Sequence, residues 1–164
     1  MNNFIYRNYT VEYLFDSSAE FSGYGDVSLP SCEYDNIVLF YQLDPSRTPE
    51  SQVEEIEEIK SKVSLITNLI NDKRIVILTL KENYLNNWEI KHSSLSQAIN
   101  DFNFSFLKKV SDNNANVKII EINQFFQQQT LDKVDWRFLF TSQMIINPKL
   151  TKPFKKWFSG QLDF

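Results

Sequence analysis

Histidine and cysteine are almost missing from this chain, which has one of each in 164 residues. His92 stands in a polar stretch, and Cys32 stands in a loop-like segment. Histidine is the usual general base near neutral pH, and zinc sites need clustered histidine, cysteine or acidic ligands. We therefore expect no metal site, and neither residue is placed where a catalyst is typical. A single cysteine also excludes an intrachain disulfide.

Glycine is scarce as well, with three residues. Two of them, Gly23 and Gly25, stand together but match neither the P-loop nor the dinucleotide fingerprint. We therefore expect no nucleotide cofactor, and no cofactor of another kind is indicated. No apolar run approaches the roughly 20 residues of a membrane span, and the N-terminus lacks the apolar core of a signal peptide. These features predict a cytoplasmic protein.

The charge balance argues against nucleic acid as a partner. The net charge is −4 and the isoelectric point is about 5.1, whereas phosphate binding needs a concentrated basic face. The one basic cluster lies near the C-terminus, where four lysines between 149 and 156 alternate with Phe154, Trp157 and Phe158. That pattern predicts an amphipathic helix that packs its aromatic side chains on the body of the protein.

Apolar runs and helical patterns alternate along the chain, which predicts a single α/β domain over residues 1–164. Strands are expected at 37–41, 75–79 and 117–122, with a shorter one at 4–6, because these runs are apolar and rich in β-branched residues. Apolar residues recur every three or four positions over 53–70 and 95–110. We expect a three-layer α/β/α sandwich with a mainly parallel sheet.

In open parallel sheets, ligands bind outside the carboxyl ends of the strands. That rule selects as ligand-binding candidates the polar residues Asn8, Tyr9, Thr10, Asp44, Arg47, Asp135 and Arg137. Each group also has a structural interpretation. Thr10 would cap a helix with Glu12 in its first turn. Asp44 and Arg47 would form the turn before a helix, and Asp135 with Arg137 would form an ion pair or cap. Both interpretations stay open at this point.

Several short motifs, taken in order, resemble a known domain. They are 7–12 (RNYTVE), 34–38 (YDNIV), 99–103 (INDFN), 117–121 (VKIIE), 135–140 (DWRFLF) and 147–148 (NP). In this order they resemble the SGNH-hydrolase-like N-terminal domain that precedes a haloacid dehalogenase-type domain in FkbH-like proteins. The resemblance spans nearly the whole chain and implies a fold of the SGNH-hydrolase-like or flavodoxin-like type. The stretch from Glu12 to Tyr34 is short for that family, so we expect one strand–helix unit to be reduced or lost.

The resemblance implies an incomplete catalytic triad. In SGNH hydrolases a serine follows the first strand, whereas this chain has Asn8, Tyr9 and Thr10 there. Asp135 stands where the family has its aspartate, but the third residue after it is Phe138 instead of histidine. The phosphatase chemistry of FkbH-like proteins is assigned to the following domain. Its Asp-x-Asp-x-Thr signature does not occur in this sequence, so that domain is expected to be absent from the chain.

Three functions follow as alternatives. The first is a non-catalytic accessory domain that binds a small oxygen-rich or carrier-linked ligand, with a haloacid dehalogenase-type domain or a carrier protein as partner, in glyceryl-carrier or surface-polysaccharide synthesis. The second is an esterase or acyl/glyceryl transferase that uses Thr10, Ser46 or Cys32 with Asp44 or Asp135 as an unusual base. The third is a protein-interaction domain whose aromatic surplus forms a homo-oligomer interface.

Overall fold

The computed structural model describes residues 2–82 and 93–162, and His92 lies outside them. Its centre is a parallel sheet with the strand order β2-β1-β3-β4-β5. The strands are β1 (Asn3–Arg7), β2 (Glu20–Tyr24), β3 (Asn36–Phe40), β4 (Arg74–Leu78) and β5 (Val117–Ile120). The predicted strands at 4–6, 37–41, 75–79 and 117–122 are therefore confirmed, within a residue or two at their ends. The order is that of flavodoxin-like sheets.

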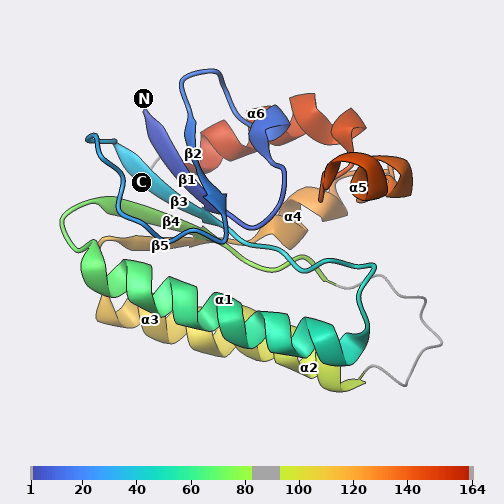
Figure 1. Ribbon diagram of the computed structural model, residues 1–164, viewed down its shortest axis with the longest axis horizontal. Helices are drawn as coiled ribbons and strands as arrows, with labels where there is room; N and C mark the ends of the chain where they lie inside the picture. The colour runs from blue at the N-terminus through green and yellow to red at the C-terminus, as the bar shows by residue number, and fades with distance from the viewer. Residues whose placement is uncertain (1, 83–92, 163–164) are drawn as a thin grey trace.

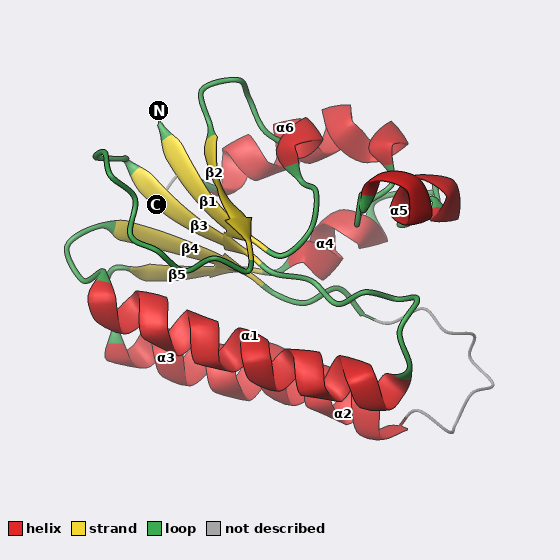
Figure 2. Cartoon of the chain, viewed as in Figure 1, coloured by secondary structure: helices red, strands yellow, loops and turns green. Residues whose placement is uncertain are grey.

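Helices cover both faces of the sheet, which makes the predicted three-layer sandwich (Figures 1 and 2). One face carries α1 (Pro49–Leu69), α2 (Ser93–Asn100) and α3 (Leu107–Asn113), the last two joined by a π-helical segment (Asp101–Phe106). The other carries α4 (Ile122–Gln127) and α6 (Thr151–Gln161). A short helix, α5 (Trp136–Ser142), lies beyond the carboxyl ends of the strands (Figure 1). None of the helices in the described ranges has the length and apolar character needed to cross a bilayer.

The central strand β3 shows why continuous apolar runs predict this architecture. All five of its residues are buried, because its side chains alternate between two helical layers. Ile37 and Leu39 pack in the cluster that includes α1, whereas Val38 and Phe40 pack in the cluster that includes α6. Phe154 of α6 is fully buried against Phe40, with 5.9 Å between the ring centroids. The amphipathic C-terminal helix is therefore confirmed.

No strand was predicted at the position of β2, although one strand–helix unit between Glu12 and Tyr34 was expected to be reduced or lost. A one-turn 3-10 helix (Glu12–Leu14) replaces the expected crossover helix, and β2 is an edge strand without an apolar run. The expected cap at Thr10 is wrong, because Val11 occupies the N-cap position and makes no side-chain cap bond. The strand of the short 12–34 stretch is thus kept, and its helix is reduced to a single turn.

Arg7 fastens this edge strand to β1. Its Nε donates to the carbonyl oxygen of Ser22 at 2.9 Å, and its guanidinium lies 4.6 Å from the ring centroid of Tyr24. The same guanidinium is paired with the carboxylate of Glu12. Arg7 thus contacts both an aromatic ring and a carboxylate. These contacts hold β2, whose own side chains bury little area.

Candidate functional site

The sheet has a topological switch point between β1 and β3. The chain leaves β1 toward β2 on one side, and β3 then begins on the other side of β1. At such a point the loops beyond two neighbouring strands diverge and leave room for a ligand. A hollow of about 440 Å³ lies there and is referred to below as the switch-point hollow. It is lined by Asn8, Tyr9, Tyr24, Gly25, Asp44, Ser46, Arg47, Glu55, Glu58, Ile59, Lys62, Leu139, Phe140 and Gln143.

Asn8 joins the loops that follow β1 and β3. Its Nδ2 donates to the carbonyl oxygen of Gln42 at 2.7 Å, and its Oδ1 accepts from the main-chain N–H of Gln42 at 3.1 Å. The side chain therefore continues the ladder of main-chain hydrogen bonds past the end of the strands. Both polar atoms of Asn8 are engaged in this way, so Asn8 shapes the floor of the hollow and positions its neighbours.

Other amide side chains do the same at this edge. The fully buried Gln42 donates from Nε2 to the carbonyl oxygen of Thr79 at 2.9 Å and accepts from the N–H of Lys81 at 2.8 Å. Asn103 accepts from the N–H of Leu80 at 2.8 Å and donates to the carbonyl oxygen of the same residue at 2.9 Å. Buried main-chain groups need partners, and these amides supply them where the strands have ended.

Tyr9 and Glu55 form a buried polar contact in the hollow. The hydroxyl of Tyr9 donates to Oε1 of Glu55 at 2.6 Å, and the N–H of Asp44 donates to Oε2 at 3.3 Å. Burial raises the pKa of Glu55 above its usual value, although the two hydrogen bonds oppose the shift. Burial and the neighbouring Glu55 also raise the pKa of Tyr9, so its phenol keeps its proton.

The mouth of the hollow carries charges of both signs. Asp44 accepts from the hydroxyl and N–H of Ser46 at 2.6 and 2.9 Å, and its other oxygen lies 3.8 Å from Nε of Arg47. Lys62 stands opposite, 2.9 Å from the point where a Cβ on Gly25 would lie. A side chain at position 25 would therefore meet Lys62. Gly25 also has a φ of 69°, a backbone conformation that favours glycine.

Thr10 stands beside the hollow and not in its lining. Its hydroxyl shares a 2.6 Å hydrogen bond with the hydroxyl of Tyr24, and its N–H donates to the carbonyl oxygen of Gln143. A threonine nucleophile needs a base within hydrogen-bonding reach. The partner here is a phenol, and none of the hydrogen bonds found in the described residues joins Thr10 to a carboxylate.

Asp135 and Arg137 are not brought into the hollow. Asp135 is the N-cap of α5 and accepts from the N–H of Arg137 at 3.1 Å, while the side chain of Arg137 pairs with the same carboxylate at 3.0 Å. The hydrogen bond from the Arg137 side chain lowers the pKa of Asp135, and the main-chain hydrogen bond and the charge of Arg137 act in the same direction. These contacts are those of the structural interpretation, in which Asp135 and Arg137 form an ion pair or a helix cap. The Arg137 side chain is 80% exposed. Helix α5 reaches the hollow through later residues, Leu139 and Phe140.

Sequence reasoning therefore found Asn8, Tyr9, Asp44 and Arg47 together, and missed Glu55 and Lys62. Glu55 had a signal in the sequence, because it precedes Ile59 by four positions and so shares the buried face of α1. Cys32, the alternative nucleophile, is exposed. No three His, Cys, Asp or Glu side chains within 2–82 and 93–162 are grouped to hold a metal ion.

No protein-family model and no curated protein sequence matches this chain. A solved structure with a similar fold is the N-terminal part of the protein BF1531 from Bacteroides fragilis, which contains a phosphatase domain and was crystallised in complex with Mg. The TM-score is 0.71 at 10% sequence identity, and the alignment covers 96% of this chain and 50% of that chain. This chain thus spans half the length of that structure, and the likeness is one of fold.

Proposed function

We propose that this chain is an accessory domain that binds a small hydroxyl-rich ligand in the switch-point hollow and works beside a phosphatase-type domain. One observation carries the proposal. The residues directly after β1, where an SGNH-type enzyme has its nucleophile, use their polar groups within the protein. Asn8 bonds to Gln42, Tyr9 to Glu55 and Thr10 to Tyr24. The hollow beyond them nevertheless presents charged groups of both signs.

The lining favours a ligand with several hydroxyl groups and one carboxylate. Asp44 and Glu58 offer acceptors for hydroxyl protons, whereas Arg47 and Lys62 offer charged donors. A volume of about 440 Å³ admits a small polar molecule with ordered water. Glycerate has this chemistry, and the resemblance to FkbH-like proteins points to glyceryl units linked to a carrier protein. We therefore take glycerate as the probe.

The likeness to half of the BF1531 structure, which contains a phosphatase domain, supports a role beside a phosphatase. The resemblance to FkbH-like proteins implies that this phosphatase is of the haloacid dehalogenase type. This chain lacks an Asp-x-Asp-x-Thr motif, and the described residues hold no group of three acidic, His or Cys ligands. We infer that it corresponds to the half without the phosphatase. Hydrolysis of p-nitrophenyl phosphate with Mg²⁺ is expected to stay at the uncatalysed rate. Turnover above a heat-denatured control would contradict this assignment.

The ligand itself is tested by calorimetric titration of the full chain with sodium D-glycerate and, separately, with glycerol. The chain offers a matched pair of variants. Arg47 and Arg137 both pair with an aspartate just before them, but only Arg47 lines the hollow. We expect Arg47→Gln to weaken glycerate binding about tenfold, which is about 1.4 kcal/mol, and Arg137→Gln to leave it unchanged. Equal losses in both variants, or no binding to the unaltered chain at millimolar glycerate, would overturn the proposal.

A further inference from the structure

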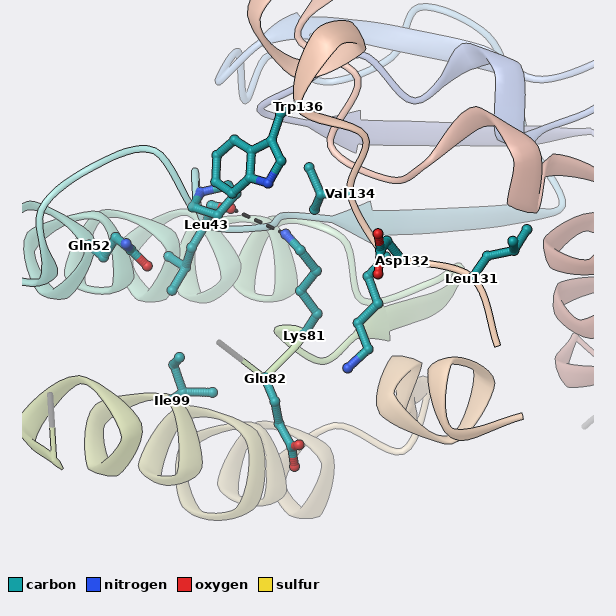
Figure 3. Close-up of a pocket in the computed structure, with 11 residues that line it drawn as sticks. Leu43, Gln52, Lys81, Glu82, Ile99, Leu131, Asp132, Val134 and Trp136 are labelled. Atoms are coloured by element: carbon teal, nitrogen blue, oxygen red, sulfur yellow. Dashed lines mark hydrogen bonds between the residues drawn. The ribbon is translucent and has the colours of Figure 1, made fainter. Parts of the chain in front are cut away.

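A second cavity, of about 390 Å³, lies on the other side of the loop that follows β3. Successive side chains of that loop alternate between the two spaces. Leu43 and Pro45 face this second cavity, whereas Asp44 and Ser46 face the switch-point hollow. The full lining is Leu43, Pro45, Gln52, Lys81, Glu82, Ile99, Leu131, Asp132, Lys133, Val134 and Trp136 (Figure 3). It is called the Lys81 cavity below.

Lys81 is a buried cation that faces this cavity. Its relative exposure is 6%, and its Nζ donates to the carbonyl oxygen of Leu43 at the long distance of 3.4 Å. Figure 3 shows the side chain extending from the end of β4 toward Leu43. An ammonium group has three donors, and no ion pair of Lys81 is found among the described residues. Burial lowers its pKa to about 8, against the opposing effect of Asp44 and Glu55.

A second cation stands on the same cavity. Lys133 is half-buried, and burial lowers its pKa to about 8 as well. Its positive charge is one of the causes that lower the pKa of Lys81. The carboxylate of Glu82 acts on Lys133, and Figure 3 shows Glu82 directed away from the ammonium of Lys81. The ammonium of Lys133 also lies 5.6 Å from the centroid of the Phe126 ring, so Lys81 is the cation whose burial an anion in this cavity would relieve.

The rest of the lining is apolar except for Gln52 and the carboxylates of Glu82 and Asp132, two residues that are exposed. Leu43 and Ile99 are buried beneath the cavity, while Leu131 and Trp136 border it with 47% and 46% of their surfaces exposed. Exposed leucine and tryptophan side chains beside a hollow gain by burial under an apolar ligand, at about 25 cal/mol per Å² covered. The cavity therefore joins a buried cation to apolar walls.

We propose that the Lys81 cavity is a second binding site, which takes a small amphiphilic monocarboxylate with its carboxylate on the ammonium of Lys81 and its hydrocarbon body against Leu131, Val134 and Trp136. A single negative charge fits a deeply buried cation, because transfer of a doubly charged phosphate to such a site costs far more hydration. This site shares no lining residue with the switch-point hollow, so it stands whether or not that hollow binds glycerate.

The test compares three probes of equal chain length: sodium octanoate, octanol and octylammonium chloride. Each is titrated into the full chain at pH 7, below the concentration at which it aggregates, with calorimetry as the readout. We expect octanoate to bind about tenfold or more tightly than octanol, and octylammonium to bind most weakly. Equal affinities for octanoate and octanol, or no binding of either, would overturn the proposal.

Variants test separately the ammonium of Lys81 and the apolar wall of the cavity. Lys81→Met should reduce octanoate affinity to that of octanol and leave octanol unchanged, and Lys62→Met, whose lysine lines the other hollow, should alter neither. Trp136→Ala should weaken both ligands alike, because it removes an apolar wall. Octanoate affinity should also fall as the pH rises from 7 to 9.5 in the unaltered chain, and not in Lys81→Met. Equal effects of Lys81→Met and Lys62→Met would show that the carboxylate does not bind at Lys81.

Discussion

Asn8 and Gln42 are bound to each other by two hydrogen bonds that join the ends of neighbouring strands. The carboxamide of Asn8 donates to the carbonyl oxygen of Gln42 and accepts from its N–H, as a further residue of β1 would do in a ladder. The fully buried Gln42 then repeats the arrangement toward β4 with its own carboxamide. The floor of the switch-point hollow is thus a rigid extension of the sheet.

Loss of the Asn8 carboxamide should therefore destabilise the whole protein. Asn8→Ala leaves the N–H and carbonyl of Gln42 without their partner, and each unsatisfied buried group costs about 1–3 kcal/mol. We expect the free energy of unfolding in urea to fall by about 2–3 kcal/mol. Asn114→Ala is the matched control, because the Asn114 side chain donates one hydrogen bond, to the carbonyl oxygen of Val110 at a helix end. A loss no larger than that of the control would contradict the role given to Asn8.

Glu55 should make the protein less stable as the pH rises through the weakly acidic range. Burial raises its pKa in the folded state, so the folded protein holds the proton more firmly than the unfolded chain. The stability that comes from the protonated form is full below the unfolded value of 4.5 and is lost as the pH rises through the higher folded pKa.

Glu55→Gln isolates this effect, since glutamine keeps an acceptor for the N–H of Asp44 and a donor for the oxygen of Tyr9. The free energy of unfolding of the unaltered chain, minus that of Glu55→Gln, should decrease from pH 4 to pH 7. Glu57→Gln, at an exposed position of the same helix, should show no such change. A difference that stays constant with pH would show that Glu55 has an ordinary pKa.

The layers of this fold were predictable from the sequence because their signals are local. The buried strands β3 and β4 are continuous apolar runs rich in β-branched residues. Thr48 and Pro49 mark the start of α1, where the Thr48 side chain accepts from the N–H of Ser51. Strand β2 gave no such signal. It lies at the edge, and Arg7 holds it through contacts with Ser22 and Tyr24 that depend on the tertiary structure.

Only those residues of the candidate site that directly follow a predicted strand could be predicted from the sequence. The topological rule brought Asn8, Tyr9, Asp44 and Arg47 to one hollow, but a sequence does not reveal which polar groups are used up by main-chain partners. Asp135 was selected by the same rule and by the resemblance, but its side chain caps α5, as its structural interpretation expected. A cytoplasmic location and a homo-oligomer stay predictions from the sequence.

Ester hydrolysis should be absent or feeble. Thr10 has a phenol as its hydrogen-bond partner, and its neighbours Asn8 and Tyr9 are engaged elsewhere. Steady-state turnover of p-nitrophenyl acetate by the full chain should equal that of a heat-denatured sample, and His92→Ala should change nothing. Vigorous turnover that disappears in His92→Ala would show that the one histidine of the chain serves a triad after all.

The buried ammonium of Lys81 should make the protein more stable at alkaline pH. Its pKa of about 8 in the folded state lies below the ordinary 10.5, so the unfolded chain binds the proton more firmly. The penalty for burying the charge is therefore full below pH 8 and is relieved as the pH rises from 8 toward 10.5. At about 1.4 kcal/mol per pKa unit, the full relief is about 3 kcal/mol. Lys81→Met should be the more stable protein at pH 7, with an advantage that shrinks between pH 8 and pH 10 in urea unfolding. Lys62→Met is the control for the removal of one lysine. If Lys81→Met raises the free energy of unfolding equally at pH 8 and pH 10, Lys81 is hydrated in solution and not buried as a charge.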